Sequence, residues 1–365
     1  MSCDSRVLIC NSPYGQGGIG QHFAQLVEET RAEGLLHSYI APGLRDSDDC
    51  GVLLSNGAFH LTRYTPLRWF PSARKHAGNV TYDVLAARML PRACRLMGFA
   101  GKSLYSFRRA RRLGYDILEL VAANSHVENV RRMHARAATV TGISDTWLNQ
   151  SQIRQTRREY DLADVIYVHS DYVRQSFLDA GIPAHKLRRT VLRVDSSFQP
   201  PDQRASADDF HVVYVGRLDA TKGIPLLLDA FKRLPISTKR LTLVGGWTSP
   251  KLRHALKGQI GADPRITVAP GDPVPVLHTA DVFVHPAFED GYAYAPAEAL
   301  ACGVPVIVTE DTGMREYVEP GRNGFIVPTG STDAIVDALL SCHRNPLVHQ
   351  QSLLSLDSTS WSAYA

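Results

Sequence analysis

The stretch that decides the fold is residues 290–308, DGYAYAPAEALACGVPVIV. Its pattern predicts a glycine-containing turn, a short helix with Pro296 at its first position, and a buried strand after Gly303. A loop that enters a helix N-terminus offers backbone N–H groups and the positive end of the helix dipole to an anion. The stretch therefore predicts a site for an anionic ligand.

Two carboxylates in this stretch add a second kind of contact. Asp290 and Glu298 lie eight residues apart, and a carboxylate accepts hydrogen bonds from hydroxyl groups. Glu289 lies nine residues from Glu298, so the residues alone leave open which acid comes first in the pair. A ligand that suits the helix N-terminus and both carboxylates carries phosphate and hydroxyl groups, as a nucleotide sugar does.

A second element lies about 70 residues earlier, in residues 215–223, VGRLDATKG. The pattern predicts a strand that ends at Val215 and a helix that begins after Gly223. Arg217 and Lys222 can converge on one diphosphate, because arginine binds phosphate as a planar fork and lysine as a point charge.

The fold class follows from strands and helices that alternate in both halves, which predicts an α/β protein with two doubly wound parallel sheets. A length of 365 residues suits two domains, and the polar, proline-containing segment 196–209 is typical of a linker. We expect Rossmann-like domains at 1–195 and 210–345, and a short tail at 346–365 that returns toward the first domain. Ligands of such sheets bind beyond the carboxyl ends of the strands, where both elements fall.

Together the two elements resemble the family 4 retaining glycosyltransferases, which carry an R-x4-K pyrophosphate clamp followed by an E-x7-E element. Asp290 stands where most members have the first glutamate, and this register puts Gly291 and Tyr292 at the family's glycine and aromatic positions. The resemblance implies the GT-B fold, in which two Rossmann-like domains face each other across a cleft. It implies retaining transfer of a hexosyl group from a nucleotide-diphosphate sugar to a glycan, lipid-linked or small-molecule acceptor. The donor is then a co-substrate, and no cofactor is expected.

The resemblance also assigns roles to single residues. Asp290, or Glu289, would hold sugar hydroxyls and Glu298 the nucleotide ribose, while Arg217 and Lys222 would stabilise the leaving diphosphate. Further donor-binding candidates lie in the loops at the strand ends: Gly216, Gly291, Tyr292, Ala293 and Gly313. Gly313 belongs to a segment that is similar to the family's GG-x-x-E pattern, with Met314 in place of the second glycine.

A glycine loop near the N-terminus satisfies G-x-G-x-x-G with Gly15, Gly17 and Gly20, which is also typical of dinucleotide-binding proteins. That interpretation requires an acidic residue at the end of the second strand, and none occurs there before Asp46. We therefore interpret Gly17 and the adjacent Gly18 as donor-binding positions of a glycosyltransferase.

His126 is the fourth catalytic candidate, because it follows the carboxyl end of a strand predicted at 116–122. A purely structural role for this histidine stays open. No metal is expected, since Asp48-Asp49 falls in an irregular loop and Asp208-Asp209 in the linker, away from any position suited to a DxD pair. Two other functions also stay open, a GT-B epimerase and a catalytically weak nucleotide-sugar-binding or membrane-associated protein.

The segment Arg74–Arg112 is strongly basic, with ten Lys or Arg and one acid, Asp83, for a net charge of +9. Apolar residues are interleaved with the charges, which is typical of helices that lie on an anionic membrane surface. Nucleic acid would fit the charge but is not expected as a partner, and a solvated helix face is the remaining alternative. No apolar run is long enough to span a bilayer and no signal-like segment opens the chain, so we expect a cytoplasmic enzyme, peripheral on the inner leaflet.

Overall fold

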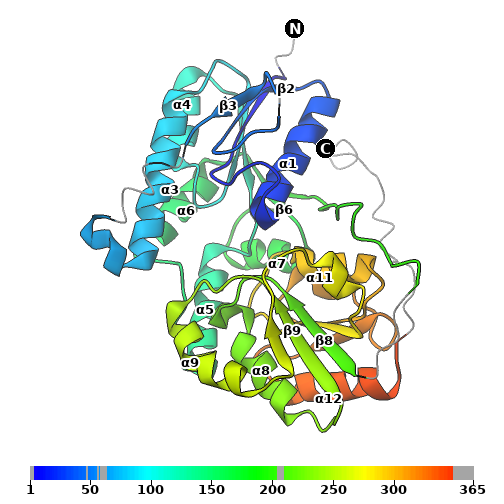
Figure 1. The fold of residues 1–365 in the computed structure, drawn as a ribbon. Helices are drawn as coiled ribbons and strands as arrows, with labels where there is room; N and C mark the ends of the chain where they lie inside the picture. Colours follow the sequence, from blue (N-terminus) through cyan, green and yellow to red (C-terminus); the bar gives the residue numbers. More distant parts are fainter. Residues whose placement is uncertain (1–3, 47, 56, 58–63, 204–208, 348–365) are drawn as a thin grey trace. The chain divides into compact units, whose positions relative to one another are not determined.

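The computed structural model describes residues 4–46, 48–55, 57, 64–203 and 209–347 (Figure 1). The predicted tail beyond residue 347 and residues 204–208 of the predicted linker lie outside this part of the chain. Two compact units are present, each built around its own parallel sheet. Among the described residues, the first contains the chain up to Asn129 together with Thr146–Leu192, and the second contains Val130–Asp145 and the chain from Arg193 to Leu347.

The first unit has a seven-stranded sheet in the order β3-β2-β1-β4-β5-β6-β7. The strands are β1 (Arg6–Ile9), β2 (Leu36–Ala41), β3 (Gly51–Leu53), β4 (Arg95–Phe99), β5 (Ile117–Val121), β6 (Val165–Val168) and β7 (Leu187–Arg189). The helices are α1 (Gly17–Ala32), α3 (Pro71–Arg88), α4 (Leu104–Leu113), α6 (Gln150–Leu162) and α7 (Asp171–Asp179), with single turns of 3-10 helix at η2 (Pro66–Trp69) and η3 (Ala184–Lys186). Helix α5 (Val127–Thr141) begins in this unit.

The second unit has a six-stranded sheet in the order β10-β9-β8-β11-β12-β13. The strands are β8 (Phe210–Val215), β9 (Lys239–Val244), β10 (Ile266–Val268), β11 (Val282–His285), β12 (Val306–Thr309) and β13 (Gly324–Val327). The helices are α8 (Ile224–Arg233), α9 (Pro250–Ala262), α10 (Val274–Leu277), α11 (Tyr294–Ala301) and α12 (Thr332–Arg344), with 3-10 turns at η4 (Ala220–Lys222) and η5 (Gly313–Tyr317).

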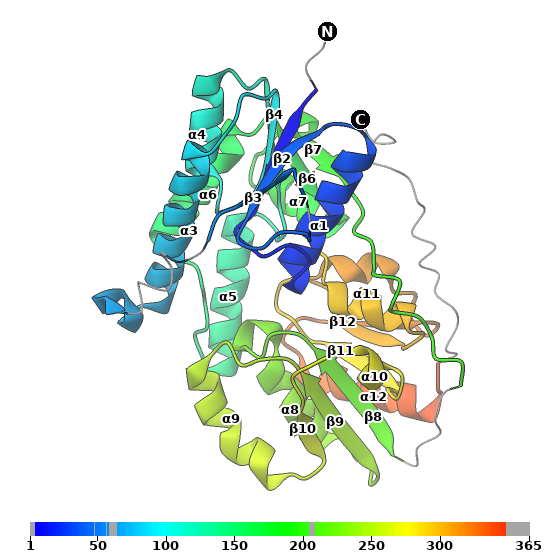
Figure 2. The same ribbon diagram turned by 45° about the horizontal axis from the view of Figure 1, so that its top comes forward.

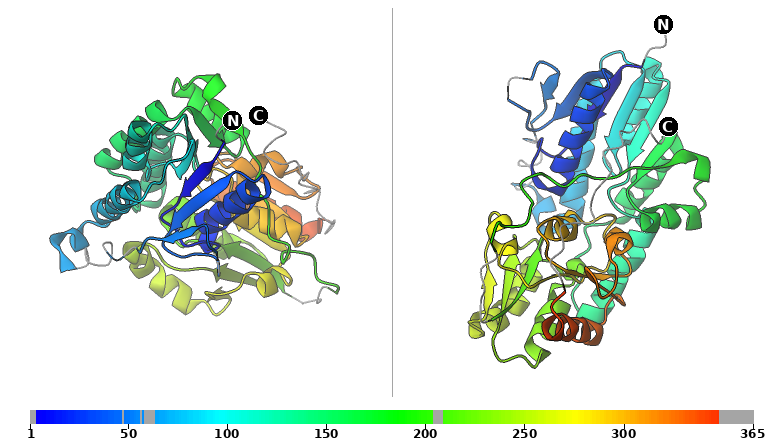
Figure 3. Two further views of the ribbon diagram at one scale, coloured as in Figure 1. Left: turned by 90° about the horizontal axis from the view of Figure 1, so that it is seen from above. Right: turned by 90° about the vertical axis from the view of Figure 1, so that its right-hand side faces the viewer.

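Helices cover both faces of the first sheet. Figures 1 and 2 show α3, α4 and α6 along one face and α1 along the other, and α1 follows the strands closely in Figure 3. This arrangement follows from right-handed crossovers, because the chain first moves from β1 to β3 and then returns past β1 to β4.

One strand and one helix boundary differ from the sequence prediction in the first unit. The sequence pattern of residues 79–97 predicts a helix, yet α3 ends at Arg88 and residues 95–99 form β4, the neighbour of β1 at the centre of the sheet. Pro91 removes a backbone N–H and so cannot continue the helix. The pattern also predicts that the first helix begins at Gly20, whereas α1 begins three residues earlier, at Gly17.

The sequence predicts a first domain that runs without interruption to residue 195. Helix α5 interrupts it, because most of the residues of this helix belong to the second unit. Ala137 is 1% exposed and packs in the same hydrophobic core as Phe288 and Leu339. Burial of apolar surface therefore attaches this helix to the second sheet, although it follows β5 of the first in sequence.

Candidate active site

The site residues of the second unit gather where the strand order of its sheet reverses. The chain runs outward from β8 through β9 to β10, and β11 then returns to pair with the opposite side of β8. Loops that leave the carboxyl ends of such neighbouring strands diverge, and the space between them is the usual ligand site of an open α/β sheet. Gly216 follows β8, and the loop from Pro286 to Ala293 follows β11.

A lysine, an aspartate and a histidine form the centre of this site. The Nζ of Lys222 lies 2.5 Å from the Oδ2 of Asp290 and 3.4 Å from the backbone oxygen of Glu289. The Nε2 of His285 lies 3.2 Å from the same Asp290 oxygen. These three side chains come from η4, from the end of β11 and from the loop that follows it, so the sheet topology brings them together.

The electrostatics of this cluster favour an ionised aspartate. Burial raises the pKa of Asp290, but the charge of Lys222 and the hydrogen bond with His285 outweigh burial and hold that pKa below its ordinary value. Burial also lowers the pKa of His285, which keeps the imidazole neutral near pH 7. A lysine cation and an aspartate anion thus face each other in a nearly dry site.

His285 was not among the residues predicted from the sequence. Its ring is 3% exposed and stacks on the ring of Tyr214, with centroids 6.3 Å apart and an interplanar angle of 4°. Its position at the end of a short apolar run, five residues before Asp290, is the signal from which it could have been predicted.

Arg217 is linked to Lys222 through Asp219. The Nη1 of Arg217 lies 3.6 Å from Asp219 Oδ2, and the backbone N–H of Lys222 donates to Asp219 Oδ1 at 3.0 Å. The Arg217 side chain is 45% exposed, so it can still turn toward a ligand. Gly216 adopts a φ of 144°, and a Cβ there would lie 2.9 Å from the Tyr214 hydroxyl, which explains the need for glycine.

The loop between Asp290 and α11 carries strain. Ala293 has a φ of 68°, the one positive value at a residue other than glycine in the part of the chain that the structure describes. Such a conformation costs of the order of 1–3 kcal/mol and occurs most often at functional sites. It directs the chain into α11, which begins at Tyr294 rather than at the predicted Pro296, and Glu298 consequently lies in the second helical turn instead of the first.

Glu298 is a buried carboxyl that no described side chain or amide hydrogen-bonds. It is 7% exposed, and burial, with a contribution from Asp195, raises its pKa to about 7. A buried acceptor without a donor is costly to keep unless a ligand supplies one. The group is therefore ready to accept hydroxyl donors.

The other predicted positions of this unit lie around the same loop. Glu289 is 4% exposed and Tyr292 is 2% exposed, with the Tyr292 ring packed edge-on against Tyr294 and Tyr317. The backbone N–H of Gly313 donates to the Asp290 carbonyl at 3.0 Å, which brings the loop after β12 against the loop after β11.

The site residues that were predicted in the first unit are far from this cluster in sequence. They belong to the other sheet. Gly17 and Gly18 are exposed and occupy the first turn of α1, beyond the carboxyl end of β1. Gly17 has a φ of 64°, which a side chain at this position would strain.

His126 is 5% exposed, and its ring packs against Tyr160 and Phe177 with centroids 4.9 and 5.2 Å away. Its Nδ1 accepts the backbone N–H of Glu128 at 3.4 Å at the start of α5, and burial lowers its pKa to about 4. These contacts favour the structural alternative for His126.

In the basic segment, most of the apolar residues that the sequence predicts to face solvent do not do so. Most of the anchors expected from sequence are buried in the first unit: Tyr82, Leu90, Leu96, Met97, Phe99, Leu104 and Phe107. The most exposed aromatic residues instead precede α3, where Tyr64, Trp69 and Phe70 are 85%, 71% and 62% exposed. We call these three residues the aromatic cluster.

The described part of the chain lacks a metal-binding cluster and a membrane-spanning helix. It holds no group of three or more His, Cys, Asp or Glu side chains arranged to bind a metal ion. None of its helices combines the length and the apolar character that crossing a bilayer demands.

Comparison with known proteins agrees with this geometry. The family described as Glycosyl transferases group 1 matches residues 195–353, a range that contains the whole Lys222, His285 and Asp290 cluster. Residues 195–353 of the second unit are therefore similar to a group 1 glycosyltransferase domain. The D-inositol 3-phosphate glycosyltransferase of Corynebacterium urealyticum is 25% identical over 299 residues, which are 71% of this chain and 69% of that protein.

Solved structures extend the likeness beyond the group 1 domain. Sucrose-phosphate synthase of Thermosynechococcus elongatus matches with a TM-score of 0.74 and 20% identity, over 94% of this chain and 90% of that one. Anabaena HepE in complex with UDP-glucose matches with a TM-score of 0.67 and 16% identity, over 95% and 93%. At these identities the likeness shows the fold, and it confirms the predicted GT-B class of two Rossmann-like domains.

Proposed function

We propose that this protein is a retaining, metal-independent glycosyltransferase that moves a hexosyl group from a nucleotide-diphosphate sugar to a glycan, lipid-linked or small-molecule acceptor. Glycosyl transfer itself is supported by the group 1 domain and its relatives. The observation that carries the finer proposal is the ion pair of Lys222 and Asp290 beside the first turn of α11, at the reversal of the strand order.

The leaving diphosphate is the group that the site has to stabilise. As the bond between the anomeric carbon and the diphosphate oxygen breaks, negative charge grows on that oxygen. Lys222 and Arg217 supply two cations, and the N-terminus of α11 supplies the positive end of a helix dipole. These groups neutralise the charge without a metal ion, so their presence supports metal independence.

The electrostatics of Asp290 support retention without an enzyme nucleophile. The Lys222 cation compensates the charge of Asp290, and His285 contacts the Oδ2 of Asp290. The pKa of Asp290 lies below its ordinary value, and such a carboxylate is a weak nucleophile. The acceptor hydroxyl then attacks the anomeric carbon on the face that the diphosphate leaves, and its proton passes to the departing oxygen. Asp290 instead accepts hydroxyls of the transferred sugar.

Donor recognition rests on groups around the loop after β11. Glu298 would accept the ribose hydroxyls, since its buried carboxyl has no donor within the described part of the chain. A nucleoside-diphosphate hexose is the donor class that we propose, because HepE binds UDP-glucose in the same fold. The name of the Corynebacterium relative supports a polyol acceptor that carries phosphate.

A peripheral position on an anionic, cytoplasmic membrane surface is part of the proposal. Exposed Trp and Tyr rings prefer the membrane–water interface, and basic residues near it gain about 1 kcal/mol each from anionic headgroups. The aromatic cluster and the basic helix α3 that follows it supply both. Replacing Trp69 and Phe70 by serine should weaken sedimentation with anionic vesicles at low salt, and unchanged sedimentation would contradict this position.

The test of glycosyl transfer is release of nucleoside diphosphate from a panel of uridine, guanosine and adenosine diphosphate sugars, in excess chelator. We expect release from donors of one base, at a rate within about twofold of that with added Mg²⁺ or Mn²⁺, because no metal would act as a Lewis acid. Donor binding without release would favour the catalytically weak alternative. Release that needs a metal would contradict the proposed charge neutralisation.

A further inference from the structure

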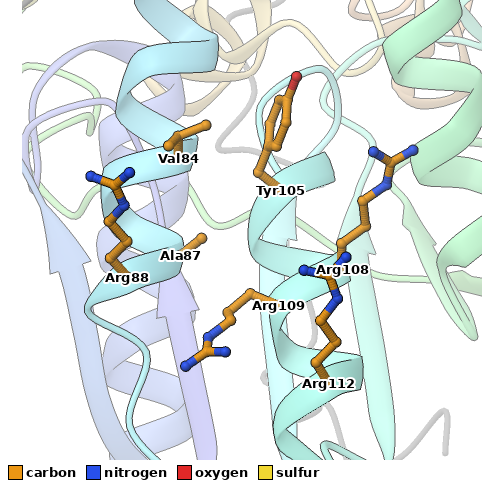
Figure 4. A pocket seen from close by; sticks show the side chains of 7 residues that line it. All are labelled: Val84, Ala87, Arg88, Tyr105, Arg108, Arg109 and Arg112. Atoms are coloured by element: carbon orange, nitrogen blue, oxygen red, sulfur yellow. The ribbon is translucent and has the colours of Figure 1, made fainter.

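A hollow of about 370 Å³ lies between α3 and α4 on the first unit (Figure 4). Its walls come from one face of each helix, since the α3 residues are spaced i, i+3, i+4 and the α4 residues i, i+3, i+4, i+7. We call it the arginine hollow, and its lining is Val84, Ala87, Arg88, Tyr105, Arg108, Arg109 and Arg112.

The four arginines that line the hollow have no acidic partner within the described part of the chain. Among the residues that the structure describes, none of the four makes an ion pair or a side-chain hydrogen bond. Arg111 of the same helix, by contrast, is not part of the lining and pairs with Asp164. Like charges at neighbouring helix positions repel each other, so an anion in the hollow would relieve a cost that the free protein carries.

The acid nearest in sequence is already engaged. Asp83 is the only acidic residue of α3, and α4 has none. It is fully buried, and its oxygens accept the backbone N–H groups of Tyr105 and Ser106 at 2.7 and 3.0 Å. Asp83 therefore joins the two helices beneath the hollow instead of neutralising it.

The two helices are also held in place from the other side. Glu159 of α6 accepts the backbone N–H groups of Ser103 and Leu104 at 2.9 and 3.0 Å, so two buried carboxylates cap the first turn of α4. A capped helix that cannot fray presents its side chains at fixed spacing. Arg88 on α3 and Arg109 on α4 consequently face a site of fixed width.

The chemistry of the lining selects a phosphate group. A guanidinium matches phosphate as a bidentate fork, and Figure 4 shows Arg109 extending from α4 toward the α3 side, where Arg88 stands. Val84, Ala87 and the ring of Tyr105 add an apolar wall. The volume falls in the range of small-ligand sites, so an organic group attached to the phosphate has room.

We propose that the arginine hollow is a second binding site, which takes a phosphate group carried by a small metabolite or by a lipid headgroup. It is distinct from the group 1 site, which lies in the other unit. It is also distinct from the aromatic cluster, because Phe70 precedes Val84 by 14 residues, about 21 Å along a helix. It would exist whether or not Lys222 and Asp290 act on a sugar donor.

Calorimetry on the full chain tests the site, with glycerol 3-phosphate as the soluble probe and vesicles of phosphatidylcholine and phosphatidic acid as the lipid probe. The test variant is Arg88→Ala/Arg109→Ala, and the matched control is Arg154→Ala/Arg158→Ala, which removes the same charge from exposed positions of α6. Loss of two charge-assisted contacts should weaken binding by about tenfold or more in the test variant and leave the control unchanged.

A third variant, Arg88→Lys/Arg109→Lys, keeps the charge but removes the planar fork. We expect it to lose several-fold in affinity, whereas a diffuse charge effect would leave it equal to the wild type. Binding of glycerol 3-phosphate assigns a metabolite, and binding of the vesicles alone assigns a lipid headgroup. The proposal is overturned if neither probe binds, or if the test and control variants weaken binding equally.

The same variants separate this site from the proposed function. Arg88→Ala/Arg109→Ala should keep nucleoside diphosphate release from a soluble donor and the melting temperature of the wild type, since both side chains are exposed. If phosphate does not bind while nucleoside diphosphate release is normal, the proposed phosphate site in the arginine hollow is overturned and the glycosyltransferase proposal stands.

Discussion

Replacing Lys222 by methionine is the perturbation that separates catalysis from folding most clearly. The substitution keeps the length of the side chain and removes the cation that lies 2.5 Å from Asp290. The side chains of the pair are 12% and 18% exposed, so the pair lies between a surface ion pair, worth up to about 1 kcal/mol, and a fully buried one, where loss of one partner costs about 3–5 kcal/mol. Because His285 still contacts Asp290, we expect the free energy of unfolding to fall by about 2 kcal/mol.

The effect of Lys222→Met on catalysis should be larger than its effect on stability. It should persist when a second substitution restores the free energy of unfolding. A preorganised group that stabilises developing charge contributes about 2.7–4 kcal/mol, so kcat/KM should fall by about 10²–10³. Adding Asp290→Asn removes the uncompensated carboxylate and should recover most of the lost stability, but no activity. Chemical denaturation and nucleoside diphosphate release would be measured on both variants. Recovery of activity together with stability in the double variant would refute a direct role for Lys222.

The remaining predictions concern two other buried acids, Glu298 and Glu119. Glu298 has a pKa raised to about 7, so affinity for the nucleoside diphosphate should rise between about pH 6 and 8 as the carboxyl ionises, and Glu298→Gln should flatten that profile in calorimetry. The same raised pKa makes folding stability fall as pH rises through about 7, and the variant should lose this dependence. Glu119→Leu leaves Arg6 and Arg95 without the carboxylate that lies 2.9 and 2.8 Å away, and should lower the free energy of unfolding by about 3–5 kcal/mol in denaturant, whereas a change under 1 kcal/mol would contradict the ion-pair argument.

The sequence was most informative where local pattern and tertiary structure agree. The strands β8 and β11 are short apolar runs that end at site loops, so their carboxyl ends could be predicted to carry Arg217 and Asp290. The strand β4 was missed because it is buried on both faces, and such a strand shows a continuous apolar run without alternation. A run like Leu96-Met97 then fits a helix equally well.

Other features of the site depend on contacts that no local pattern reveals. The stacking of His285 on Tyr214 joins neighbouring strands and depends on the pairing of β11 with β8. The contact of His285 with Asp290 depends on the path of the loop that follows β11. The positive φ of Ala293, which moves the start of α11, has no signal in composition because alanine rarely adopts it. The aromatic cluster lies in a stretch without periodicity, where sequence could not separate exposed from buried rings.

The most direct measurement of the central claim is the kcat/KM of nucleoside diphosphate release by Arg217→Ala set against the wild type, with the same donor and acceptor. Arg217 is half-exposed and its ion pair with Asp219 is 3.6 Å long, so its loss should leave the melting temperature unchanged. The account predicts a fall in kcat/KM of about 10²-fold or more, since a cation that neutralises the leaving diphosphate would be missing. Turnover equal to that of the wild type would contradict it.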